Sequence, residues 1–273
     1  MALDVSGGRL AFVIMRQLSL FVRHLFFVPL TCLLFWACGQ SAVLDVLPEG
    51  ETGRVVRIID GDALVLDTGL SVRLAGLEAP APERRNRPGE PFANEASRML
   101  EDMALGRRVT LYYPGLTRDR YNRALAYVVT VDDLGPKVWL NKELARRGGA
   151  RVRVYPDTAA LAENLLEAER LARIESIGLW GETSYRILSA TALGRDEQGF
   201  RIVTAGGLRR TDIVDAERYS CALMTGDSAF FVDVGPAASE ICLAPPDEAL
   251  VRGYVRNGRM ELTHGLNMQP LSP

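Results

Sequence analysis

Apolar and polar positions alternate along "GRVVRIIDGDALVLDTGLSVRLAGL", residues 53–77. A period of two predicts β-strands, here three of them. The turns between them are predicted at Asp60–Asp62 and Asp67–Gly69, because glycine and aspartate accept the positive φ of tight hairpins. Two more strands are predicted in "RRVTLYYPG" (107–115) and "RALAYVVTV" (123–131).

Helical spacing interrupts the strand pattern three times. The predicted helices lie in "ANEASRMLEDMALG" (93–106), "VWLNKELARRGGARV" (138–152) and "DTAALAENLLEAERLARIESIGLW" (157–180). In the third, Asp157 is predicted as the N-cap and Gly178 as the stop. The fold class is therefore predicted as α+β, with a five-stranded OB-type β-barrel and three flanking helices over residues 53–183.

The third predicted helix is rich in charge. Its charged positions are spaced for i,i+4 pairs, and we interpret them as a solvated face. They are Glu163, Glu167, Glu169, Arg170, Arg173 and Glu175.

The pattern changes after Trp180. Residues 184–273 hold short β-like runs: "FRIVTAGG", "RRTDIVD", "AFFVDVG" and "EALVRGYVRNGRMEL". Asn257-Gly258 is a strong hairpin signal between two such runs. We predict a smaller β-rich C-terminal domain.

The N-terminal segment has the layout of an export signal. Basic residues precede an apolar run over residues 25–37, and small and polar residues follow it. Residues 1–38 are predicted as a signal peptide or lipoprotein leader, and 39–52 as a linker. The run is shorter than the roughly 20 residues of a spanning helix. Simple cleavage, lipidation at Cys38 and a retained membrane anchor stay open. We expect an exported protein: periplasmic, an envelope lipoprotein or secreted.

Composition narrows the function classes. With 48% hydrophobic and 24% charged residues the chain is typical of a globular protein. A net charge of -2 gives no global basic field, so binding of a polyanion must come from a local arrangement. The histidines are His24 and His264 and no Cys-x-x-Cys occurs, which argues against zinc sites and histidine-based triads.

Beyond the leader the cysteines are Cys221 and Cys242. An even number fits a disulfide in an oxidising compartment, and we predict this bond. Two buried free thiols are the alternative.

Charged residues gather where the predicted barrel strands end. Asp60 and Asp62 lie in the first turn, Arg73 in the third strand and Glu78 at its exit; Arg123 follows a loop with further arginines. Carboxylates from different strands suit Ca²⁺, and paired arginines suit a phosphate. Taken singly, each feature is equally consistent with an ordinary hairpin or a solvated loop.

In combination these segments resemble the thermonuclease (staphylococcal-nuclease-like) family. The resemblance is carried by "IIDGDALVLDTGLSVRLAGLEAPAPE", "NEAS", "TRDRYNRALAYV", "LNKELARRGGARV" and "GLW", in order, over about residues 53–181. It implies an OB-type barrel that hydrolyses DNA and RNA with Ca²⁺ and leaves 3′-phosphates.

The resemblance also implies residue roles. Asp62 is the first metal carboxylate with Asp60 in support, Glu78 stands where the family has an aspartate ligand, and Ala79 where a threonine offers its carbonyl. Another divalent cation is possible. The remaining roles are catalytic arginines at Arg73 and Arg123 and substrate-binding tyrosines at Tyr121 and Tyr155.

The chain departs from the family pattern at the general base. The family's base glutamate follows the loop proline, whereas Pro80 is followed here by Ala81. Glu83, after Pro82, is the predicted stand-in, and a solvated loop acid is the alternative reading.

Two functions therefore compete. One is a monomeric, exported, calcium-dependent nuclease acting on DNA or RNA, most simply single-stranded, with activity reduced by Ala81. The other is a non-catalytic barrel that binds nucleic acid or protein at the cell envelope, with membrane attachment through the leader or a lipidated Cys38.

Overall fold

The computed structural model describes residues 43–85, 87–194, 196–213, 215–226 and 230–271. The predicted leader lies outside these residues. Within the described ranges, no helix has the length and apolar character needed to cross a membrane.

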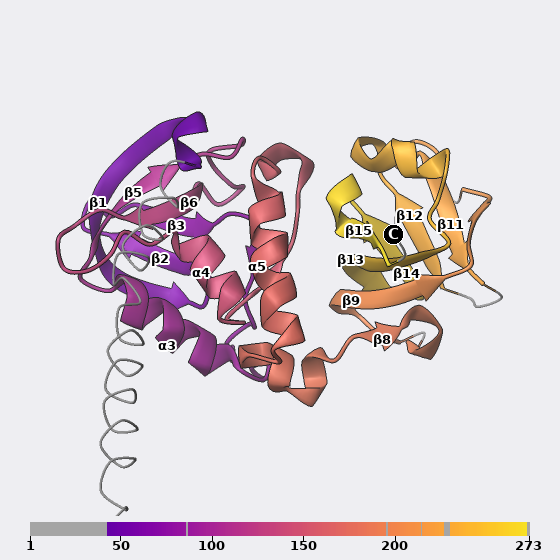
Figure 1. Cartoon of the computed structure of the whole chain (residues 1–273), viewed down its shortest axis with the longest axis horizontal. Coiled ribbons are helices and arrows are strands. Elements are labelled where there is room, and N and C mark those ends of the chain that lie inside the picture. The colour runs from indigo at the N-terminus through magenta and orange to yellow at the C-terminus, as the bar shows by residue number, and fades with distance from the viewer. Residues whose placement is uncertain (1–42, 86, 195, 214, 227–229, 272–273) are drawn as a thin grey trace, which may run out of the picture.

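Five strands close into a barrel in the order β1-β2-β3-β6-β5 (Figure 1). They are β1 (Glu49–Asp60), β2 (Ala63–Leu66), β3 (Ser71–Leu74), β5 (Arg108–Tyr112) and β6 (Ala124–Thr130). The β3–β6 pair is parallel and the other pairs are antiparallel. Strand alternation turns fully buried side chains such as Val55, Leu64 and Leu111 into the core. The α+β class of the prediction is confirmed.

The predicted helices correspond to α3 (Ala93–Ala104), α4 (Leu140–Arg146) and α5 (Ala162–Ile174). The N-cap prediction was wrong. Asp157 lies in a separate 3-10 turn, Pro156–Thr158, and α5 begins beyond it with Leu161 as its N-cap residue. The Asp157 carbonyl accepts the Leu116 N–H, so the loop before β6 holds this residue away from the helix.

The solvated-face interpretation of α5 was wrong for Glu169. Glu167 and Arg170 form an exposed pair as expected, but the Glu169 side chain has no exposed surface. Its Oε1 accepts the Val152 N–H at 3.0 Å, and its Oε2 faces the C-terminal domain.

Positive φ was the predicted reason for glycine in the Asp60-Gly61-Asp62 turn, but the structure gives a different reason. The residues of this turn do not have positive φ, whereas Gly69 in the second turn does (φ 84°). A Cβ on Gly61 would lie 2.8 Å from the Cβ atoms of both Ala79 and Ala96. Lack of space, not backbone conformation, therefore selects this glycine.

The C-terminal domain is a mixed sheet of eight strands in the order β10-β11-β12-β14-β13-β9-β8, with β15 paired to β13. Asn257 and Gly258 both have positive φ at the β13–β14 hairpin, as that turn type requires. The strands are β8 (Leu188–Ser189), β9 (Gly199–Gly206), β10 (Leu208–Thr211), β11 (Cys221–Thr225), β12 (Phe231–Val234), β13 (Glu248–Arg256), β14 (Arg259–Leu262) and β15 (Met268–Pro270).

Short elements connect the larger ones. Strands β4 (Leu77–Glu78) and β7 (Arg151–Val152) pair with each other beside the barrel. The remaining 3-10 helices are η2 (Leu44–Val46), η4 (Gly178–Gly181), η5 (Thr183–Tyr185), η6 (Ala190–Ala192), η7 (Pro236–Cys242) and η8 (Gly265–Asn267).

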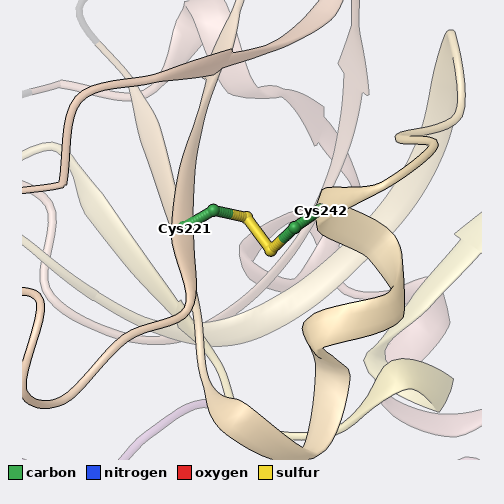
Figure 2. Close-up of a disulfide and its surroundings, with 2 residues drawn as sticks. All are labelled: Cys221 and Cys242. Carbon is green, nitrogen blue, oxygen red and sulfur yellow. A yellow bond between two sulfur atoms is a disulfide. The ribbon is translucent and has the colours of Figure 1, made fainter.

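A disulfide joins Cys221, at the start of β11, to Cys242, at the end of η7 (Figure 2). It closes a sequence separation of 21 residues. In the chain-entropy account, a loop of this size contributes about 3 kcal/mol to stability. The bond fastens η7 to the sheet that forms the core of the C-terminal domain.

The two domains meet through α5, β7 and β13. Arg252 of β13 has no exposed side-chain surface, and its Nη1 lies 2.6 Å from Glu169 Oε2 and 3.0 Å from the Val152 carbonyl. Arg151 reaches the other way and donates to the Phe200 carbonyl at 2.9 Å. These are charge-assisted bonds removed from water, so they fix how the domains sit together.

We predict that Arg252→Leu lowers the free energy of unfolding by about 3–5 kcal/mol, because it leaves the Glu169 charge buried without its partner. Denaturant unfolding measures the change. The matched control is Arg170→Leu, which breaks the exposed pair with Glu167 and should change stability little. Equal losses in the two variants would contradict the prediction.

Candidate functional site

Asp62 lies at the bottom of the site, in the β1–β2 turn, and is 2% exposed. Arg73 Nη1 donates to its Oδ1 at 2.9 Å, and the Ala79 N–H donates to its Oδ2 at 2.8 Å. The Asp60 side chain holds the turn by accepting the Asp62 N–H at 3.2 Å. The local fold thus buries a carboxylate and gives each of its oxygens a donor.

Burial raises the pKa of Asp62 to about 7. Arg73 and the Ala79 N–H oppose this shift, while the charges of Asp60 and Glu78 add to it. Loss of hydration is thus the main cost of ionising Asp62, and the neighbouring carboxylates are a smaller one.

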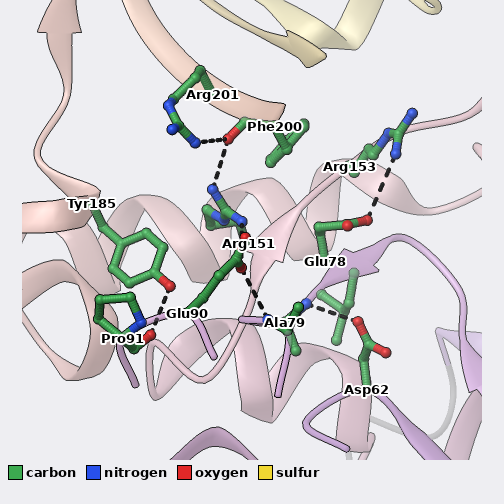
Figure 3. Close-up of polar contacts among 12 residues, drawn as sticks. Asp62, Glu78, Ala79, Glu90, Pro91, Arg151, Arg153, Tyr185, Phe200 and Arg201 are labelled. Atoms are coloured by element: carbon green, nitrogen blue, oxygen red, sulfur yellow. Dashed lines mark hydrogen bonds and ion pairs between the residues drawn. The ribbon is translucent and has the colours of Figure 1, made fainter. Parts of the chain in front are cut away.

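Glu78 is the last residue of β4, the short strand after β3, and its carboxylate points toward Arg153 (Figure 3). Its Oε2 lies 3.4 Å from Arg73 Nη2 and 3.7 Å from Arg153 Nη1. Arg73 therefore bridges the two carboxylates that the sequence predicted as metal ligands. All three, with Asp60 and Ala79, line one cavity of about 170 Å³.

The donor set of this cavity fits a hard divalent cation. Asp60, Asp62 and Glu78 supply the carboxylate oxygens that such a cation prefers, and Arg73, Arg84 and Arg87 line the same cavity. In the described ranges, no three or more acidic, histidine or cysteine side chains lie close enough together to hold a metal ion by themselves, so a cation here would depend on one or two carboxylates and on backbone oxygen.

Arg123 is placed by the loop before β6. Its Nε donates to Asp119 Oδ2 at 2.7 Å, and its backbone N–H donates to Asp119 Oδ1 at 2.9 Å. The parallel register sets Arg73 opposite Leu125, so both arginines reach the same end of the barrel. Together with Tyr121 and Tyr155 they line a groove of about 670 Å³.

The structure does not bring Glu83 to the site. Its side chain is exposed, and it does not line the cavity that holds Asp62 and Glu78. Glu90 is the carboxylate that lies next to Ala81, although it does not line that cavity either. Its Oε2 accepts the Ala81 N–H at 2.9 Å, while its own N–H donates to the Ala81 carbonyl at 2.8 Å. These bonds fold the proline-rich loop back, so that a carboxylate from further along the chain lies beside Ala81.

Three neighbouring residues were missed by sequence reasoning: Glu90, Arg153 and Tyr254. Arg153 and Tyr155 belong to the segment after α4, and the Arg153 guanidinium carbon lies 4.3 Å from the Tyr155 ring centroid. Tyr254 comes from the C-terminal domain and donates to Glu78 Oε1 at 3.1 Å. Alternation in "RVRVY" hinted at Arg153, but no local pattern links Tyr254 to a residue so far away in the sequence.

Comparison with known proteins agrees with this geometry. Residues 71–182 match the family model described as "Staphylococcal nuclease homologue". The chain is 31% identical to the thermonuclease of Staphylococcus intermedius over 135 residues, which is 48% of this chain and 77% of that protein. It is also 31% identical to the thermonuclease of Staphylococcus hyicus over 144 residues (52% and 82%). A probable endonuclease lcl3 of Neosartorya fischeri is 35% identical over 123 residues (42% and 41%).

We predict that the affinity for Ca²⁺ falls below about pH 7, by up to tenfold for each pH unit, because a proton then competes for the Asp62 carboxylate. The direction of the effect follows from the raised pKa, because the Asp62 carboxylate is ionised above about pH 7 and protonated below it. Calorimetric titration at several pH values measures the effect. Asp62→Asn, the control, should bind weakly at every pH; a wild-type affinity independent of pH between about 5 and 8 would contradict the prediction.

Proposed function

Because the chain belongs to the staphylococcal nuclease family, we propose that it is a calcium-dependent nuclease that hydrolyses phosphodiester bonds of DNA or RNA, with single strands as its preferred substrate. The relatives named thermonuclease and probable endonuclease support the reaction class. The observation that carries the proposal is the shared position of Arg73 and Arg123 in one groove beside Glu78.

The two arginines bind and stabilise the reacting phosphate in this proposal. An arginine fork matches two phosphate oxygens, and its fixed charge stabilises the extra negative charge of a five-coordinate phosphorus. Asp119 holds Arg123 in place through three contacts to its backbone and side chain. The Tyr121 ring centroid lies 5.6 Å from the Arg123 guanidinium carbon. The ring can stack on a base or pack against the arginine.

Asp62 and Glu78, with the Ala79 carbonyl, are the proposed ligands of Ca²⁺. Bound calcium supplies a Lewis acid for a phosphoryl oxygen and lowers the pKa of a bound water. Arg73 links this cation site to the phosphate, because it contacts both carboxylates and also lines the groove.

We propose reduced activity because alanine stands at the position of the base. General-base assistance contributes roughly 10²–10⁴ in rate, and neither Ala81 nor the exposed Glu83 is placed to supply it. The same observation favours the second candidate, a non-catalytic barrel that binds nucleic acid. Retention of Asp62, Arg73 and Arg123 together favours the enzyme.

Export remains part of the proposal on the basis of the leader. A basic segment followed by a short apolar run and small residues is typical of secretory signals. The disulfide of the C-terminal domain is consistent with an oxidising compartment.

We predict that purified protein digests single-stranded DNA when Ca²⁺ is present and that Arg73→Ala slows cleavage by about 10²–10³, the size of one lost transition-state donor. Product formation on a labelled strand measures the rate. The matched control is Arg57→Ala, an exposed arginine on β1 outside the groove, which should retain the wild-type rate. No cleavage by the wild type, or cleavage that Arg73→Ala does not change, would reject the enzyme.

We predict that Glu83→Gln retains the wild-type rate, because the exposed Glu83 side chain does not line the cavity that holds Asp62; a loss of tenfold or more would restore it as the stand-in base. Glu90→Gln is the informative partner, since the Glu90 carboxylate is the one held at Ala81. A loss in Glu90→Gln alone would transfer the role to Glu90. Unchanged rates in both variants would leave water activation to the cation.

A further inference from the structure

Tyr254, from the C-terminal domain, lines two neighbouring hollows. Its side chain lines the groove that holds Arg73 and Arg123, and also a larger cleft of about 720 Å³ between the domains. Glu78 lines both as well, and the Tyr254 hydroxyl donates to it at 3.1 Å. The two hollows therefore meet at this hydrogen bond.

Tyr254 also completes an aromatic cluster around Arg153. The Arg153 guanidinium carbon lies 4.1 Å from the Tyr254 ring centroid and 4.3 Å from that of Tyr155. Each ring keeps a large exposed fraction, 40% for Tyr254 and 36% for Tyr155. Exposed rings beside a cation are the elements on which proteins stack the bases of single strands.

Strand alternation extends this surface. Side chains two residues apart share one face of a strand, so Arg252, Tyr254 and Arg256 of β13 follow one another on the face that meets the nuclease domain. Arg252 is the buried anchor, Tyr254 lies at the junction, and Arg256 lies in the interdomain cleft. The Arg256 backbone pairs with Arg259 of β14, but the Arg256 side chain is exposed and has no hydrogen bond or ion pair to another described residue.

Each of the other arginines that line the cleft has a carboxylate partner. Arg259 pairs with Asp233, and Arg218 pairs with Glu261. On the opposite wall, Arg87 and Arg151 face Glu90. Arg256 is thus the cation left to contact a phosphate, and Tyr254 and Tyr219 supply rings near it.

We propose that the C-terminal domain forms the second wall of the nucleic-acid groove: a single strand that passes Arg73 and Arg123 continues over Tyr254 into the interdomain cleft and places a phosphate at Arg256. The inference rests on the proposed function in that the strand is nucleic acid. The family match ends at residue 182, so these contacts come from outside the matched region.

Binding of fluorescent single-stranded DNA to the full chain tests this, measured by anisotropy with a chelator so that the strand stays intact. Strands of about 4 and about 16 nucleotides span the site sizes of one OB-fold. Arg256→Ala should weaken binding of the longer strand, leave the shorter one within about twofold, and lower the salt slope by about 0.7, the value of one lost phosphate contact. Arg210→Ala, an exposed arginine of the same domain outside both hollows, should change neither quantity.

Tyr254 variants separate stacking from the hydroxyl. Tyr254→Ala should weaken binding of the longer strand roughly 5- to 150-fold, the size of one lost stack, while Tyr254→Phe keeps the ring and the affinity. Thermal melting checks that each variant is folded. If Tyr254→Ala does not fold, the Arg256→Ala measurement tests the proposal without it.

The two proposals fail differently. A wild type that binds the longer strand through Arg256 but never cuts it rejects the nuclease and supports the second wall. Equal affinities and salt slopes for the wild type, Arg256→Ala and Arg210→Ala overturn the second wall, whether or not cleavage occurs.

Discussion

The contact between Arg252 and Glu169 is the constraint on which the arrangement of the two domains depends. Two charges without solvent contact must stay together, since separating them costs several kcal/mol. Glu169 also accepts the Val152 N–H, so the pair is tied to β7, the partner of the strand that carries Glu78. Fixing Arg252 therefore fixes Tyr254, two residues along the same strand, against the carboxylate of the site.

The site itself is organised around a carboxylate that is buried away from water. Burial raises the pKa of Asp62, the charges of Asp60 and Glu78 add to the rise, and Arg73 opposes it. Such a cluster is costly in a fold that gains nothing from it. A cation between the carboxylates and a phosphate against the arginines would balance each other, which is why the geometry supports phosphodiester chemistry better than it supports an ordinary hairpin.

The barrel could be predicted because its signals are local. Period-two alternation located the strands, and the residues at their ends located Asp62, Arg73 and Glu78. Other features depend on what packs from far away. Glu169 has the sequence context of a solvated helix face and becomes buried only when β13 covers it. Glu90 reaches Ala81 only because the loop folds back, and Tyr254 meets Glu78 across 176 positions of sequence.

The alternation of β13 has a consequence for how the chain can change in evolution. A single insertion or deletion before Tyr254 would exchange the two faces of the strand. The side chains of Arg252, Tyr254 and Arg256 would then turn into the core of the C-terminal domain. Those of Ala249, Val251 and Val255 would turn toward the nuclease domain. We expect related chains to vary in the loops around β13 while the length of the strand stays constant.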